Sequence, residues 1–238
     1  MATILTMMLL LQTQPYPDVI DYSKGIALEL AGPIQILKGR GYAIDEAGMI
    51  QALQDPLVRD MAGLLLRERA YLKVDFNTPA IAAALEKAFN DATREKNESD
   101  MDILAATLLT TAERGWVIDA VAALPLMKAR SYQARLAQTL AFAGRGEGWP
   151  YVRDEVASGD AQRIYSALGR IDKFDGLANP LDGGQPIDVA RELHQLATTT
   201  PDNVTWPTIV PESQRQRSKD YIEAKAQQID KAKAEKRQ

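Results

Sequence analysis

The sequence predicts an all-α fold, an α-solenoid of about four stacked helix pairs with a capping helix and a loose C-terminal tail. Three observations lead to this prediction. Alanine and leucine dominate the 238 residues and only 6% are aromatic, a composition that favours helices over sheets. Apolar residues recur at steps of three and four rather than in alternation. Aromatic residues that follow turns recur at intervals close to the length of one helix pair.

Stripes of apolar residues mark the expected helices. A stripe at helical spacing needs a partner surface on one side, so each helix is expected to pack against another. No run of residues alternates between apolar and polar, and β-branched residues do not cluster, so no strand is predicted. The stripes comprise Met49, Ile50 and Leu53; Leu57, Val58, Met61, Leu64 and Leu65; Ile81, Leu85 and Phe89; Ile103, Ala106 and Leu109; Leu136 and Leu140; and Ile164, Leu168 and Ile171.

Four aromatic residues set the register of the helix pairs. Tyr42, Phe76, Trp116 and Trp149 each follow a turn, at intervals of 34, 40 and 33 residues. Gly184 stands 35 residues further on, where a fifth aromatic would fall. Within each interval we predict a helix, a short break and a second helix, with the aromatics sealing the junctions between neighbouring pairs.

An Ile-Asp dipeptide recurs where a first helix should begin, and its acidic residue is Asp45, Asp119 or Asp188. Each is predicted to be the N-cap or a first-turn residue of its helix, because a carboxylate accepts free backbone N–H groups and suits the positive end of a helix. The polar stretch Asn90–Asp100 (NDATREKNESD) is predicted to be a flexible insertion between two helices. Such an insertion would account for the 40-residue interval.

The stretch Asp55–Leu66 (DPLVRDMAGLLL) is the most informative second helix. Asp55 is placed to cap it, Pro56 suits its first position, and the small Ala62 lets a neighbouring helix approach closely. This stretch resembles the second helix of the HEAT-repeat family, which often reads D-P-x-V-R-x-x-A-x-x-L. The matching residues are Asp55, Pro56, Val58, Arg59, Ala62 and Leu65.

The resemblance covers residues 42–172 and weakens along the chain. The unit at Asp160 keeps a shifted form of the motif, and the units around Ala106 and Ala137 keep only the small residue and the apolar spacing. The resemblance implies a protein-binding solenoid in which Arg59 bonds laterally to a neighbouring acidic residue. An irregular helical bundle with chance spacing is the alternative.

Composition divides the chain into four parts. Residues 1–17 are an apolar N-terminal segment, 18–198 the helical-repeat domain, 199–211 an irregular linker, and 212–238 a charged tail that is helical or disordered. The apolar run within the first part is too short to cross a bilayer, which takes about 20 residues. It is either a first buried helix or a signal peptide. The protein is accordingly cytoplasmic or exported, and the sequence leaves both interpretations open.

Composition also limits the possible chemistry. The net charge of −4 and the pI near 5.2 argue against nucleic-acid binding, which needs many Lys and Arg contacts to phosphates. The absence of cysteine excludes thiol catalysis and cysteine metal sites. Because His194 is the only histidine, a site with several histidines cannot form within one chain. No cofactor, metal or membrane span is predicted.

Three features could carry chemistry, and each has a simpler structural interpretation. The glycine-rich run Gly144–Gly148 lacks the preceding strand of a phosphate-binding loop, so it is predicted to be a turn. His194 borders an apolar stripe and is predicted to be a partly buried structural residue. The carboxylate pairs Asp100–Asp102 and Asp154–Glu155 are predicted to be helix caps and solvated faces, because residues one or two apart on a helix do not face each other.

The favoured function is therefore a non-catalytic scaffold that binds another protein through the inner surface of the solenoid. No catalytic residue is predicted, and neither the partner nor the oligomeric state follows from the sequence. One alternative is a helical-repeat hydrolase or lyase, which would need buried carboxylates with raised pKa values in a cleft. Another is an exported, envelope-associated subunit.

Overall fold

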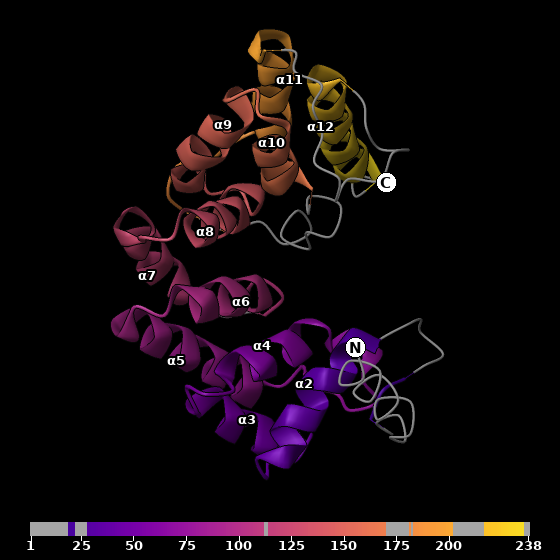
Figure 1. The fold of residues 1–238 in the computed structure, drawn as a ribbon, viewed down its shortest axis with the longest axis vertical. Helices are drawn as coiled ribbons and strands as arrows, with labels where there is room; N and C mark the ends of the chain where they lie inside the picture. The colour runs from indigo at the N-terminus through magenta and orange to yellow at the C-terminus, as the bar shows by residue number, and fades with distance from the viewer. Residues whose placement is uncertain are drawn as a thin grey trace, which may run out of the picture. The chain divides into compact units, whose positions relative to one another are not determined.

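The described part of the chain is helical. It forms eleven α-helices and three short 3-10 helices, and its only β pairing consists of two isolated bridges, Ile20 with Leu72 and Arg145 with Pro186. The all-α prediction is thus confirmed (Figure 1). No helix among these residues is both long and apolar enough to cross a bilayer. The computed structural model describes residues 19–21, 28–111, 114–169, 181, 183–201 and 217–235.

The chain divides into two compact units, Met1–Ala84 and Leu85–Gln238, with the division inside α5. The predicted N-terminal segment, residues 1–17, lies outside the described residues, as does most of the predicted linker, residues 199–211. The first unit contains α2 (Leu28–Gly39), α3 (Glu46–Gln54), α4 (Arg59–Arg67) and the 3-10 helix η2 (Arg69–Tyr71). The later elements are α5 (Pro79–Glu95), α6 (Glu98–Leu108), α7 (Trp116–Ala123), η3 (Leu124–Leu126), α8 (Arg130–Phe142), η4 (Gly146–Gly148), α9 (Trp149–Ala157), α10 (Ala161–Leu168), α11 (Val189–Thr199) and α12 (Ser218–Glu235).

In the first unit α4 packs against α2 and α3. Leu53 of α3 meets Ala62 and Leu65 of α4 in a core from which all three are fully withdrawn from solvent. Arg59 is also buried, and its Nε donates to the carbonyl of Leu53 at 3.1 Å. The arginine that the family resemblance singles out therefore joins the start of α4 to the end of α3.

The start of α4 corrects the sequence prediction. Asp55 accepts the backbone N–H of Leu57 and the hydroxyl of Tyr42, both at 2.9 Å. A carboxylate that bonds the amide two residues ahead closes a turn. Residues 55–58 accordingly form a turn, and α4 begins at Arg59 rather than at Pro56.

The described residues of each predicted interval form two α-helices, so the helix–break–helix pattern is confirmed for them. In the second unit the packing contacts join each helix to the next one or the next but one. Phe89 of α5 meets Trp116 of α7 edge-on, with ring centroids 5.6 Å apart. Helix α8 packs against α6, α9 and α10, while α9 contacts α11 and α10 contacts α12.

The predicted insertion at Asn90–Asp100 is not a loop. Helix α5 continues to Glu95 and α6 starts at Glu98, so only two residues separate them. Asn97 caps α6 by accepting the N–H of Asp100 at 3.3 Å. The polar residues prolong α5 because its buried stripe continues through Ala92, which is fully buried.

All three aspartates lie at the start of a helix as predicted, two as N-caps and one in the first turn. Asp45 accepts the N–H of Gly48 at 2.8 Å, and Asp188 accepts that of Arg191 at 3.4 Å. Asp119 lies in the first turn of α7, which begins three residues earlier at the buried Trp116.

Within the predicted tail, Ser218–Glu235 form a packed helix, so the helical alternative holds for these residues and the prediction of a loose tail is wrong for them. Helix α12 lies alongside α11 (Figure 1). Its large apolar residues are few, but Ile222, Ala226 and Ile229 fall on one face and are fully buried. Spacings of four and three residues place these side chains on a single stripe, which is enough to dock a helix.

Gly148 lets α8 and α9 approach closely, and Gly148→Ala is expected to destabilise the protein by about 1–3 kcal/mol. A Cβ at this position would collide with the backbone carbonyl of Ala137 in α8, which cannot move without shifting the helix. Gly39→Ala is the matched control, because nothing lies within 4 Å of a Cβ at that position. Urea unfolding of both variants checks the prediction, and equal midpoints would contradict it.

Candidate interaction surface

A line of apolar residues is exposed to solvent on α7 and η3, next to the exposed Asp119. Ile118 is 75% exposed and Leu126 is 77% exposed, and Ala122 lies exposed between them. Val121 and Pro125 flank this line. We call these five residues the α7 surface. Single exposed apolar residues are common, but a line of them at spacings of four along one face marks a candidate binding site.

The opposite face of α7 is apolar as well and anchors the helix. Trp116 and Ala120 are fully buried, and Val117 and Leu124 nearly so. Apart from the exposed Asp119, every residue of α7 is apolar, and a helix that is apolar all round is normally covered on every side. In the described structure α7 is covered on one side only, so its second apolar face is available to a partner.

Hydrogen bonds from α6 fix the segment that follows the α7 surface. The two carboxylate oxygens of Glu98 accept the backbone N–H groups of Lys128 and Ala129 at 2.6 and 2.8 Å. Gln133 of α8 donates to the carbonyl of Leu124 at 2.9 Å. These bonds hold η3, which carries Leu126, against the body of the second unit.

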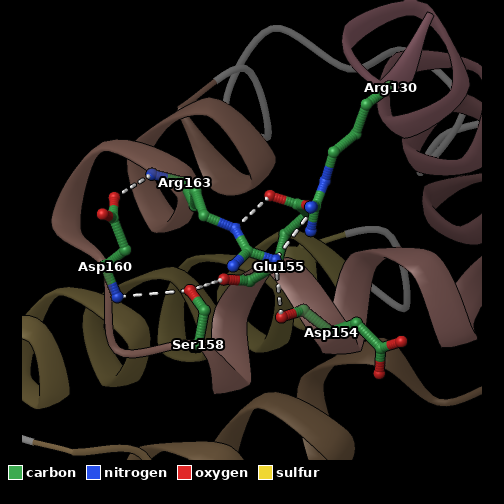
Figure 2. Close-up of polar contacts among 6 residues, drawn as sticks. All are labelled: Arg130, Asp154, Glu155, Ser158, Asp160 and Arg163. Atoms are coloured by element: carbon green, nitrogen blue, oxygen red, sulfur yellow. Dashed lines mark hydrogen bonds and ion pairs between the residues drawn. The ribbon is translucent and has the colours of Figure 1, made fainter.

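A carboxylate between two guanidinium groups fixes the other side of the same connection (Figure 2). Glu155 of α9 accepts from Nε of Arg130, the first residue of α8, at 2.7 Å and from Nε of Arg163 in α10 at 2.8 Å. Burial alone would raise the pKa of Glu155, but the bonds from Arg163 and Arg130 lower it. Glu155 thus stays ionised and ties three helices together.

The same network shapes the turn between α9 and α10. Asp160 caps α10 by accepting the N–H of Arg163 at 2.9 Å, and Ser158 donates to the carbonyl of Glu155 at 2.6 Å. Figure 2 shows Asp160 at the backbone N–H of Arg163, while the guanidinium of Arg163 is directed at Glu155 and at the carbonyl of Asp154. Hydrogen bonds from α6 and α8 hold the end of the α7 surface and the segment after it, and such preorganisation reduces the entropy lost on binding.

The two carboxylate pairs lie in different surroundings from those predicted. Asp100 and Asp102 are buried rather than solvated, and Asp102 pairs with Nε of Arg135 in α8 at 2.8 Å. Asp154 is exposed as predicted, whereas its neighbour Glu155 is partly buried between arginines. Asp100 and Asp102 are buried because the start of α6 also faces α8, which packs against α6.

The glycine-rich run is a turn, as predicted. Gly144 adopts a left-handed conformation at the end of α8, with φ of 90°. Arg145 then turns back to bond Glu147, with Nε 3.1 Å from the carboxylate. Because this arginine is engaged with its own loop, the run presents no free cation to a phosphate.

His194 joins α11 to α12. Its Nδ1 lies 2.8 Å from the carboxylate of Glu223 and its Nε2 lies 3.0 Å from that of Asp230. Lys233 of α12 bonds Asp188 at the start of α11, at 2.8 Å. Bonds to Asp230 and Glu223 raise the pKa of His194 above its ordinary value near 6.5. We call these five residues the α11–α12 clamp, and its histidine is partly buried as predicted.

The protein is expected to lose stability as the pH rises through the raised pKa of His194. A group whose folded pKa is raised stabilises the fold below its unfolded pKa, near 6.5, and this contribution disappears above its folded pKa. The effect is modest because solvent screens the clamp. Unfolding free energies measured between pH 6 and 9 should fall for the natural chain and stay nearer constant for His194→Gln. Parallel curves for the two proteins would refute this role.

Several carboxyl groups have lowered pKa values, whereas an acid–base enzyme would need a raised one. A lowered pKa keeps a carboxyl ionised and accepting hydrogen bonds at neutral pH. Among the described residues, no three His, Cys, Asp or Glu side chains gather in a way that would hold a metal. The carboxyl groups with lowered pKa values are those of Asp55, Asp91, Glu147, Glu155, Asp188 and Glu223.

Sequence reasoning missed the α7 surface, although a signal for it exists. Ile118, Ala122 and Leu126 follow one another at intervals of four, beside a second apolar line through Trp116 and Ala120. Comparison of the chain with family models, with curated proteins and with solved structures finds no match. The resemblance to the HEAT-repeat family therefore rests on the residues quoted for it.

Proposed function

We propose that this protein is a non-catalytic scaffold, built as a solenoid of helix pairs, that binds another protein through the α7 surface. The solenoid is supported by the contacts in the second unit. Pairs α5–α6, α7–α8, α9–α10 and α11–α12 would each meet the next pair through first helices, as α9 meets α11, and through second helices, as α6 meets α8. Stacked repeats contact only their neighbours in this way.

The exposed line of Ile118, Ala122 and Leu126 is the observation that carries the binding role. Ile118 in α7 and Leu126 in η3 are two large aliphatic side chains, each more than 70% exposed. Aliphatic surface of this kind gains free energy when a partner removes it from water. The prediction of binding through an inner surface stays a prediction, and the α7 surface is the more specific proposal.

Ile118→Glu combined with Leu126→Glu is expected to abolish partner binding. Each substitution places a charge where the partner would bury an apolar side chain, which costs several kcal/mol if the charge is desolvated. The measurement is affinity capture from the native host with the tagged full-length chain. Proteins captured by the natural chain should be lost with the double variant.

Leu57→Glu is the matched control, because Leu57 is an equally prominent leucine, 71% exposed, in the first unit. This variant should retain the partner. Circular dichroism and thermal unfolding establish that all the variants fold, since exposed substitutions shift stability by only about 0.5 kcal/mol. Capture that survives in the double variant would refute the proposed surface.

A further inference from the structure

We propose that the α7 surface pairs with the α7 surface of a second copy of this chain, the two helices running antiparallel about a two-fold axis near Ala122. This inference rests on the proposed function and names its partner. Closed two-fold dimers use one patch on both subunits, so the patch must complement itself. Both the shape and the charge of the α7 surface meet that condition.

The shape of the surface is symmetric about its centre. Ile118 lies four residues before Ala122 and Leu126 lies four residues after it, and all three are exposed. In an antiparallel pair Ile118 of one copy faces Leu126 of the other. The small alanine at the crossing point lets the two helices approach within the usual 8–10 Å.

The charges at the ends of the surface complement each other in the same arrangement. Asp119 lies at one end and Lys128 at the other, and both are exposed. Within the described part of the chain, neither side chain forms an ion pair. The antiparallel arrangement brings Asp119 of each copy to Lys128 of the other, whereas a parallel arrangement would place like charges together. Electrostatic complementarity of this kind fixes the register of an interface.

The size of the surface sets the expected strength of the dimer. The line from Ile118 to Leu126 covers nine residues of α7 and η3, about 12–14 Å at rises of 1.5 Å per residue in an α-helix and 2.0 Å in a 3-10 helix. Stable interfaces bury about 800 Å² on each partner, which is more than two helical turns provide. We therefore expect a reversible dimer with a dissociation constant of about 1–100 μM, weaker than standard-sized interfaces give.

Sedimentation of the full-length chain tests the dimer. The natural protein should pass from monomer to dimer as its concentration rises through that range. Ile118→Glu with Leu126→Glu should weaken the dimer by at least about 100-fold, because both copies lose their central apolar contacts. Leu57→Glu should dimerise like the natural chain. A natural chain that stays monomeric throughout, or a double variant that still dimerises, overturns the inference.

A charge exchange tests the antiparallel arrangement. Asp119→Lys alone places lysine opposite lysine, and Lys128→Asp alone places aspartate opposite aspartate, so each should weaken the dimer by at least about threefold. Combining both changes restores opposite charges and should restore the dimer. Mixing the two single variants should produce a mixed dimer, because one then carries two lysines and the other two aspartates. Absence of both rescues overturns the antiparallel arrangement.

Failure of this inference can be distinguished from failure of the proposed function. If the natural chain is monomeric but captures a different protein through Ile118 and Leu126, the proposed function stands and the second copy is excluded as the occupant. If a photoreactive amino acid at position 126 cross-links only within its own chain, the dimer is likewise excluded. If the chain is monomeric and nothing captured depends on the α7 surface, both proposals fail.

Discussion

Trp116→Ala should lower the free energy of unfolding by about 3–5 kcal/mol, the cost of removing a large aromatic from a core that cannot collapse around the cavity. Trp116 is fully buried at the first residue of α7 and meets the ring of Phe89 edge-on at 5.6 Å. It therefore links α5 to α7 and supports the helix that carries the α7 surface. Urea unfolding followed by circular dichroism measures the loss.

A double-mutant cycle separates the ring contact from the cavity. Phe89→Ala, Trp116→Ala and the combined variant should reveal a coupling of about 0.5–1.5 kcal/mol for an edge-to-face pair. A total loss below about 1 kcal/mol for Trp116→Ala would mean that the tryptophan is less well packed than its burial indicates. The prediction that aromatic residues after turns seal the junctions between helix pairs would then be wrong.

Ile222→Ala should destabilise the docking of α12 by about 2–5 kcal/mol, the usual cost of truncating a fully buried isoleucine. Ile222 is one of the few large apolar residues of α12, so no neighbouring contact can replace it. Amide hydrogen exchange measures the effect, because α12 should open more often while helices remote from it keep their protection. The polar clamp at His194 is too solvent-exposed to compensate.

Lys231→Ala is the control on the same helix. Its ammonium group is exposed, and its pairing with Glu235 at 3.8 Å involves two exposed side chains. Such a pair contributes at most about 1 kcal/mol to stability, so the rate of amide hydrogen exchange in α12 should barely change. If both variants open α12 equally, the helix is held by something other than its apolar stripe.

The sequence is sufficient to predict the fold class and the spacing of the helices, because both depend on local signals. Apolar steps of three and four define one face of a helix whatever it later packs against. Asp45 and Asp188 act as caps because a carboxylate satisfies backbone N–H groups within its own helix.

The sequence is insufficient where distant contacts decide the outcome. Position alone predicts that Asp55 caps α4, but the hydroxyl of Tyr42, thirteen residues away, helps to hold it in a turn. The prediction of a loose tail depends on the small number of its large apolar residues. Docking of α12 depends instead on the alignment of those residues with Ala226 and on the presence of α11 opposite them.

The candidate binding surface could not be predicted because exposure is a tertiary property. Val117 and Ile118 are adjacent and equally apolar, yet the first is buried and the second is 75% exposed. Which face of an apolar helix is covered depends on the helices around it. The buried position of Asp102 could not be predicted for the same reason, since it follows from the packing of α6 against α8.

The hydrogen bonds of Glu98 couple the local unfolding of two helix ends in the second unit. It supplies the acceptor for the amides of Lys128 and Ala129, 30 and 31 residues away, at a helix start that lacks a side-chain cap of its own. Fraying at the beginning of α6 therefore exposes the beginning of α8 as well. These two helix ends should exchange their amide protons at a common rate, as one cooperative unit that does not include α7.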